Sequence, residues 1–259
     1  MPTLAFAQVN ADTFEERVAE GGVDIYVRND EYSAVTFRFK LNLKNVLASS
    51  DERLIVVPAR TERFLVYELR LDPKAREFSY GYEYVSNVGD HTSTAQDDYV
   101  YELPVAAGTE VFISQGYNGK FSHQGAKALD FDMPEGTPIH AIRGGVVTDV
   151  VEVNDRGCAD KSCEKFENRI VIVHDDGTFA GYAHLRKNGA FVSIGERVKK
   201  GQLLGESGAT GYANGPHLHL SVYHQRMDGR KYVATRFKTA GAQVPGLLKE
   251  HRSYRRPLD

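Results

Sequence analysis

The sequence contains no tryptophan, only two cysteines, and no apolar run longer than a few residues. A transmembrane helix needs about 20 consecutive apolar residues, so none is expected. The net charge of −3 over 259 residues argues against a broad electrostatic surface for nucleic acid. An apolar fraction of 41% is ordinary for globular proteins and excludes disorder for the bulk of the chain. A chain of this length holds one large domain or two of ordinary size.

The N-terminal part is dominated by alternating apolar and polar residues. Such alternation places one set of side chains on a core face and the other in water, as in a β-strand. The sequence therefore predicts a β-sandwich-like domain over residues 23–105. Its tyrosines are open to two interpretations, core packing or contact with a polysaccharide or protein partner. The apolar positions that alternate are Val35, Phe37, Phe39, Leu41 and Leu43, then Leu65, Tyr67, Leu69 and Leu71, then Phe78, Tyr80, Tyr82 and Tyr84.

Residues 1–22 are expected to form a separate N-terminal segment, with at most one short helix over residues 12–19. Ala5, Phe6 and Ala7 before Gln8 resemble the small-x-small end of a signal peptide. Two interpretations stay open, a remnant of a longer signal or an ordinary frayed terminus.

The composition changes near residues 104–116, where Pro104, Gly108 and Gly116 indicate a boundary. Glycine is dense beyond it, and seven of the nine histidines lie between His123 and His224. Short apolar runs separated by turn residues predict a second β domain over residues 106–235. Residues 236–259 are expected to be a C-terminal tail.

Cys158 and Cys163 enclose a short polar segment. Two cysteines are too few for a structural zinc site. They are either a small disulfide loop or two unrelated thiols, and exposure of the segment favours the disulfide. A disulfide would indicate an oxidising compartment.

Several histidines and one aspartate have a spacing typical of a metal site. His217 and His219 are two positions apart, so a strand would place both imidazoles on one face. His123 precedes Asp130, and His184 follows another apolar run. Two neutral imidazoles and one carboxylate would leave Zn²⁺ with an open position, the pattern of a catalytic site. No His-Glu-x-x-His helix is present, so a histidine outside the ligand set is expected to handle the proton.

These motifs closely resemble the zinc metallopeptidases of the lysostaphin type, peptidase family M23, over about residues 112–225. The resemblance rests on the His123 and Asp130 motif and on three further segments. It implies a compact, mainly antiparallel β domain with a narrow zinc groove. The segments are Gly136-Thr137-Pro138-Ile139 leading to Gly144-Gly145-Val146-Val147, Tyr182-Ala183-His184-Leu185, and Gly208-Ala209-Thr210-Gly211 leading to His217-Leu218-His219.

The resemblance implies that one zinc ion is held by His123, Asp130 and His219. Many members of the family space the first histidine and the aspartate by four residues, whereas here they are seven apart. Asp132 is therefore an alternative ligand. Asp130 is preferred, because Asp130-Phe131 leading to Pro134 aligns with the Asp-Phe…Pro run of the family.

The resemblance also implies roles for residues beside the metal. His184 and His217 would be the catalytic histidines that handle the water and the transition state. Tyr117 would match a tyrosine that stabilises the oxyanion in some members.

The activity implied is a zinc endopeptidase acting on peptide bonds in peptidoglycan stem peptides or cross-links, in the periplasm or secreted. The sandwich would shield the groove or dock an unidentified partner. One alternative is a non-catalytic peptidoglycan-binding regulator of another hydrolase. Another alternative is a carrier domain. A biotinyl or lipoyl carrier needs a lysine at an exposed hairpin tip, and this sequence offers no convincing candidate.

Overall fold

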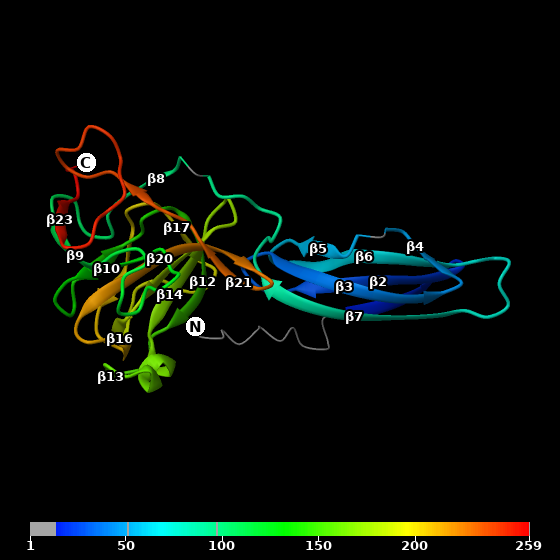
Figure 1. The fold of residues 1–259 in the computed structure, drawn as a ribbon. Coiled ribbons are helices and arrows are strands. Elements are labelled where there is room, and N and C mark those ends of the chain that lie inside the picture. Colours follow the sequence, from blue (N-terminus) through cyan, green and yellow to red (C-terminus); the bar gives the residue numbers. More distant parts are fainter. Residues whose placement is uncertain (1–13, 51, 97, 259) are drawn as a thin grey trace. The chain divides into compact units, whose positions relative to one another are not determined.

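The computed structural model describes residues 14–50, 52–96 and 98–258, whose regular elements are β-strands apart from one short 3₁₀ helix (Figure 1). Contacts divide the chain into two compact units. Of the described residues, the first unit holds those up to Thr92 together with Gln225–Gly229, and the second holds Ser93–His224 together with those from Arg230 onward. No helix in these described ranges is long and apolar enough to cross a membrane.

The described strands of the first unit form two antiparallel sheets, which confirms the predicted sandwich. One sheet has the order β1-β2-β6-β4 and the other the order β5-β3-β7. The strands of the first sheet are β1 (Phe14–Ala19), β2 (Gly22–Asn29), β6 (Thr61–Leu71) and β4 (Val46–Ala48). Those of the second are β5 (Leu54–Val57), β3 (Val35–Lys44) and β7 (Ser79–Val88).

An aromatic cluster fills the space between these sheets. Phe37, Phe39 and Tyr67 are at most 4% exposed. Tyr80 and Tyr82 pack against the cluster, and their hydroxyls donate to the two carboxylate oxygens of Glu16 at 2.9 and 3.0 Å. The tyrosine row of β7 is therefore part of the packing of the sandwich.

The expectation of at most a short helix over residues 12–19 is wrong for residues 14–19, which form strand β1. β1 pairs with β2 through a turn at Gly21, whose φ is 70°. Phe14 packs edge-on against Phe37 and Phe39, with ring centroids 5.7 and 6.0 Å apart. This long-range aromatic packing outweighs the weak helical preference of a polar segment. The signal-like residues Ala5–Ala7 lie outside the described residues.

A β-bulge interrupts the alternation predicted for β6. Ile25 pairs with Tyr67 and Tyr26 pairs with Leu65, so Val66 is the additional residue. Val66 then faces inward at 7% exposure, while Leu65 is 43% exposed. A bulge moves the residues on one side of it to the opposite face, which period-two reasoning does not detect.

The second unit is built on a large sheet, ordered β17-β12-β14-β15-β20-β10-β9-β23 among the described strands, with β21 paired to β20. Each pair of neighbouring strands along this order, from β17 to β23, is antiparallel. Its strands are β9 (Glu110–Gln115), β10 (Ala128–Asp132), β12 (Gly145–Val151), β14 (Arg169–Val173), β15 (Phe179–Ala183), β17 (Arg197–Val198), β20 (His217–Arg226), β21 (Gly229–Tyr232) and β23 (Arg252–Arg255). The segment expected as a tail thus supplies β23.

Smaller sheets and one short helix complete the described part of this unit. β11 (Pro138–His140), β18 (Leu203–Ser207) and β16 (Leu185–Ala190) form one sheet. β13 (Gly157–Cys158) pairs in parallel with β19 (Gly211–Tyr212), and β22 (Arg236–Phe237) with β8 (Val100–Tyr101). The 3₁₀ helix η2 (Lys161–Phe166) is capped by Asp160, which accepts from the Ser162 N–H. The predicted disulfide between Cys158 and Cys163 is present.

Candidate active site

The antiparallel pair β10 and β20 places two predicted site residues side by side. Asp130 is the register partner of His219. Because side chains alternate along a strand, their neighbours Leu129 and Leu218 point to the opposite face and are at most 1% exposed. The apolar core beneath these strands therefore holds Asp130 and His219 on a common face.

His123 reaches the same face from the loop between β9 and β10. Its side chain is fully buried. Its Nδ1 lies 2.9 Å from the Gly116 carbonyl oxygen. A carbonyl oxygen only accepts, so Nδ1 is the donor and Nε2 is left with its lone pair. The loop turns at Gly125, whose φ is 75°, a conformation that glycine adopts without strain.

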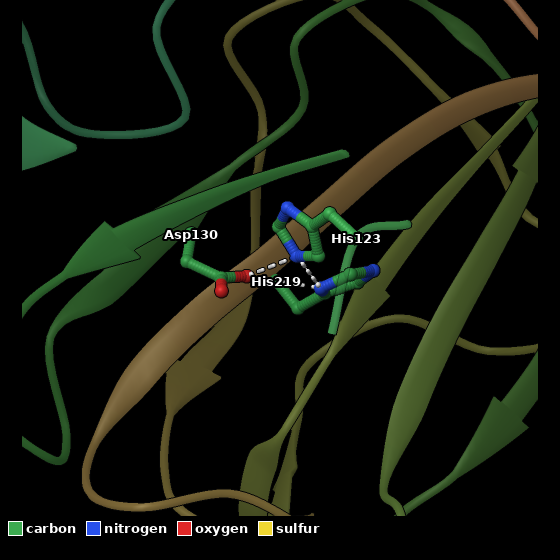
Figure 2. Close-up of side chains that lie close together, drawn as sticks. All are labelled: His123, Asp130 and His219. Atoms are coloured by element: carbon green, nitrogen blue, oxygen red, sulfur yellow. Dashed lines mark hydrogen bonds and ion pairs between the residues drawn. The ribbon is translucent and has the colours of Figure 1, made fainter. Parts of the chain in front are cut away.

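His123, Asp130 and His219 converge into what we call the metal cluster (Figure 2). One potential ligand atom from each residue lies within 4.8 Å of the others. Asp130 Oδ1 is 3.1 Å from His123 Nε2 and 2.9 Å from His219 Nδ1. The two histidine nitrogens are 3.2 Å apart. Two imidazole nitrogens and one carboxylate oxygen are donors that suit Zn²⁺.

Within the metal cluster, Asp130 and His219 shift each other's pKa. Burial would raise the pKa of the Asp130 carboxyl, but its close contacts with the imidazoles of His123 and His219 outweigh it and hold that pKa well below its usual range. Burial would lower the pKa of His219, yet its hydrogen bond to Asp130 and the negative charge there leave it raised. Asp130 therefore remains a carboxylate, the form that binds a cation.

His184 and His217, which we call the histidine pair, stand beside the cluster. Their ring centroids are 4.6 Å apart, and that of His184 is 5.8 Å from that of His219. His217 Nε2 is 3.8 Å from Asp130 Oδ1. Each ring donates through Nδ1 to a backbone carbonyl, His184 to Thr210 at 2.7 Å and His217 to Gly215 at 2.8 Å. Nε2 is therefore the nitrogen each ring can offer to other groups.

Burial lowers the pKa of His184 to about 3, with a further contribution from the positive charge that His217 and His219 can carry. The ring is 6% exposed. His184 is therefore neutral near pH 7.

Comparison with known proteins identifies the family of the segment that carries most of these residues. Residues 124–232 match the family model described as peptidase family M23. This segment is a peptidase family M23 domain. It contains Asp130, His184, His217 and His219, and it begins one residue after His123.

Two relatives of the M23 domain are named for their enzymatic activities. The glycyl-glycine endopeptidase ALE-1 of Staphylococcus capitis is 40% identical over 106 residues, covering 40% of this chain and 25% of ALE-1. The peptidoglycan DD-endopeptidase ShyC of Vibrio cholerae is 36% identical over 94 residues, covering 36% of this chain and 19% of ShyC. The crystallised catalytic domain of lysostaphin from Staphylococcus simulans is 27% identical with a TM-score of 0.36, covering 48% of this chain and 87% of that domain. The chain thus spans a quarter or less of these two curated relatives.

Gln115, which precedes the matched segment, is a residue beside the metal cluster that sequence reasoning missed. Its Nε2 donates to Asp130 Oδ2 and to Ser122 Oγ, both at 2.8 Å. Its Oε1 accepts the N–H groups of Phe121 and Ser122 at 3.0 and 3.1 Å. Gln115 therefore links the loop of His123 to the carboxylate of Asp130. Its register pairing with Asp130 across a bulged ladder carries no sequence motif.

Two other predicted candidates, Asp132 and Tyr117, are not among the three residues that converge in the metal cluster. Asp132 is exposed and pairs in register with His217. The carboxylate beside His123 is that of Asp130, whose Oδ1 lies 3.1 Å from His123 Nε2. The Tyr117 hydroxyl lies 2.5 Å from Thr235 Oγ1 and accepts the Thr235 N–H at 2.8 Å. Its proposed oxyanion role remains a prediction.

Proposed function

We propose that this chain is a zinc-dependent endopeptidase that hydrolyses peptide bonds in peptidoglycan peptides. The observation that carries the proposal is the convergence of His123, Asp130 and His219 beside the histidine pair. Three donors leave a tetrahedral cation one position for a reactant, which distinguishes a catalytic site from a closed structural one.

The residues fit a zinc ion. His123 Nε2 is left with its lone pair because Nδ1 is bound to the Gly116 carbonyl. Asp130 is ionised and receives support on its second oxygen from Gln115. Outer contacts of this kind orient ligands toward a metal. When bound, zinc supplies a Lewis acid that eases deprotonation of water and polarises a peptide carbonyl.

The histidine pair is suited to proton transfer. Their Nδ1 atoms are held by the carbonyls of Thr210 and Gly215. This fixes the tautomer and leaves each Nε2 to exchange a proton with a reactant. We assign to His217 and His184 the removal of a proton from the attacking water and its delivery to the departing amine.

The substrate class is supported by the relatives. ALE-1 is named a glycyl-glycine endopeptidase and ShyC a peptidoglycan DD-endopeptidase. Both names specify peptide-bond hydrolysis, but the bonds differ. We therefore propose the stem peptides or cross-links of peptidoglycan as the substrate. A location outside the cytoplasm follows from this substrate and agrees with the disulfide between Cys158 and Cys163.

The deciding experiment is mass spectrometry of purified cross-linked peptidoglycan after incubation with the zinc-loaded full chain. New peptide termini that disappear with a chelator are expected, and their masses identify the bond. His217→Ala should abolish them, while His140→Ala, whose ring contacts the Gly201 carbonyl and is not part of the metal cluster, should not.

Zinc bound without any new termini would contradict the proposal. That result would instead support a non-catalytic peptidoglycan-binding protein, which a pull-down on insoluble peptidoglycan would test directly.

A further inference from the structure

His184 has an uncommon backbone conformation. It lies between β15 and β16 with a φ of 64°. Residues other than glycine seldom adopt this left-handed region, and they stay there only when their surroundings enforce it. The structure therefore has to contain groups that hold His184.

Thr210 is the first such group. Its carbonyl accepts from the His184 ring at 2.7 Å, and its hydroxyl donates to the Leu185 carbonyl at 2.7 Å. The same hydroxyl accepts the Asn168 N–H at 3.1 Å. Thr210 thus holds both the ring of His184 and the backbone of the next residue.

Asn168 completes the enclosure. Its carbonyl accepts the Leu185 N–H at 3.2 Å, and its side-chain amide donates to the carbonyls of Leu185 at 3.3 Å and Asn154 at 2.8 Å. Asn168 is fully buried and Thr210 is 5% exposed. We call Asn168, Leu185 and Thr210 the His184 clamp. Buried networks of this kind are rigid when every polar group has its partner.

The disulfide segment is attached directly to this clamp. Cys158 and Cys163 close the loop that leads through η2 to Asn168. Cys158 also pairs in register with Tyr212, two residues after Thr210. The Ala213 N–H donates to the Cys158 carbonyl at 3.1 Å. The disulfide therefore closes the loop that leads to Asn168, and the pairing of β13 with β19 joins this loop to the segment that carries Thr210.

Close backbone contact makes this attachment tight. A Cβ on Gly157 would lie 1.6 Å from the Ala209 carbonyl oxygen, so a side chain is excluded there. Gly211 has a φ of 80°, and a Cβ on it would lie 2.9 Å from Glu167 Cα. Glycine at both positions lets residues 157 and 167 approach the segment of Thr210.

The metal cluster is held by other groups. His123 is bound by the Gly116 carbonyl, Asp130 by Gln115, and His219 by the β10–β20 ladder. In the described part of the chain, none of these supporting contacts involves Asn168, Leu185 or Thr210. Loss of the clamp should therefore leave the metal ligands in place.

We propose that the disulfide-stapled His184 clamp positions His184 for turnover and is dispensable for zinc binding. The inference rests on the proposed function, because turnover is its main readout. Asn168 and Thr210 are then positioning residues, since they act on the reaction through His184.

The first test compares Thr210→Val with Thr210→Ser in the zinc-loaded full chain. The isosteric valine removes the hydroxyl, and a displacement of about 1 Å in a catalytic group can reduce rate by about 100-fold. We expect kcat to fall by about 10- to 100-fold with KM within about threefold and zinc content unchanged. Serine restores the hydroxyl and should recover most of kcat.

Thr148→Val is the matched control. Thr148 lies in β12, and its hydroxyl donates to the Val171 carbonyl at 3.3 Å. It should leave kcat and zinc content unchanged. Equal losses in Thr148→Val and Thr210→Val would overturn the positioning role.

The second test removes the staple with the double variant Cys158→Ser and Cys163→Ser. Amide hydrogen exchange at Leu185, whose N–H donates to Asn168, reports the clamp without any substrate. We expect faster exchange there in this variant and in Thr210→Val, with unchanged exchange in β10.

The outcomes distinguish a failure of the proposed endopeptidase function from a failure of the proposed role of the His184 clamp. A wild-type protein that cleaves no peptidoglycan contradicts the proposed function, and Leu185 exchange still tests the clamp. Unchanged exchange at Leu185 in both variants overturns the inference, as does an active wild type whose clamp variants retain full kcat. Loss of zinc from Thr210→Val overturns the claimed independence from the metal cluster.

Discussion

Asp130 and His219 of the metal cluster differ from the histidine pair in what orients their side chains. Asp130 and His219 stand opposite each other on paired strands over a buried apolar core. His184 and His217 are oriented instead by hydrogen bonds to the backbone carbonyls of Thr210 and Gly215. Thr210 and Gly215 lie between β18 and β20 rather than in either strand.

Strand pairing thus positions Asp130 and His219 against each other, whereas backbone carbonyls set the ring orientation of the histidine pair. His123 is also oriented by a backbone carbonyl, that of Gly116. Paired strands fix side chains more firmly than loops do. A metal needs its ligands at narrowly defined positions, whereas a proton-transfer group needs a set tautomer and orientation. Zinc binding and turnover should therefore respond to different substitutions, which gives ways to break or sharpen the comparison.

Removal of a cluster member should have the largest effect. His123→Ala deletes a ligand whose side chain is fully buried, so zinc affinity should fall by more than the 10- to 100-fold range typical of supporting residues. Cleavage should disappear with it. Metal analysis after dialysis measures the zinc content, and a competition titration with a chromogenic chelator measures the zinc affinity. An enzyme that keeps stoichiometric zinc would show that the cluster is not the binding site.

Removal of a histidine-pair member should abolish turnover alone. His217→Ala leaves His123, Asp130 and His219 in place, so zinc should stay bound. The loss of a general acid or base should lower kcat by about 10²- to 10⁴-fold. Stopped assays on a defined muropeptide, with zinc quantified in the same sample, make the comparison. Zinc loss in parallel with kcat would erase the distinction between the two halves of the site.

Replacement of Gln115 should weaken the cluster moderately. Gln115→Leu removes the donor to Asp130 Oδ2 and the acceptor that holds the Phe121 N–H. Zinc affinity should fall by about 10- to 100-fold, as for other residues that support ligands. Gln202→Leu is the matched control, because Gln202 ties a turn at Lys199 by a similar bond at 3.0 Å. Equal zinc affinities in both variants would contradict the role of Gln115.

Much of this arrangement could be predicted from the sequence, for identifiable reasons. The alternation at Val35, Phe37 and Phe39 is a local signal, and these residues form β3 with at most 4% exposure. The disulfide followed from a short polar segment between two cysteines. Antiparallel β structure and the M23 motifs are likewise encoded in short stretches of sequence.

Other features depend on long-range packing that no local pattern records. β1 is a strand because Phe14 packs against β3. The bulge at Val66 depends on the register with β2. Gln115 and the His184 clamp act through contacts between residues distant in the chain, such as the 42 positions that separate Asn168 and Thr210. Hydrogen bonds to backbone carbonyls are independent of residue identity at the acceptor, so they leave no motif.

His174 offers the smallest and sharpest comparison, because it is held as His184 is but lies outside the site. It is 3% exposed, and its Nδ1 lies 2.9 Å from the Gly144 carbonyl oxygen. Burial lowers its pKa from 6.5 to about 4, and the nearby Arg143 charge acts in the same direction. In the described residues its Nε2 has no hydrogen-bond partner, so protonation there is unfavourable in the fold.

The unfolded chain therefore takes up the proton first as pH falls. The contribution of His174 to stability is complete above about pH 6.5 and is lost progressively toward about pH 4. His174→Asn keeps a donor for Gly144 but does not titrate, so its melting temperature should decline less steeply over this window, by a few degrees. Zinc content and kcat at pH 7.5 should match the wild type. Parallel melting profiles would show that this buried histidine does not couple folding to pH, and a loss of kcat would show that it belongs to the active site after all.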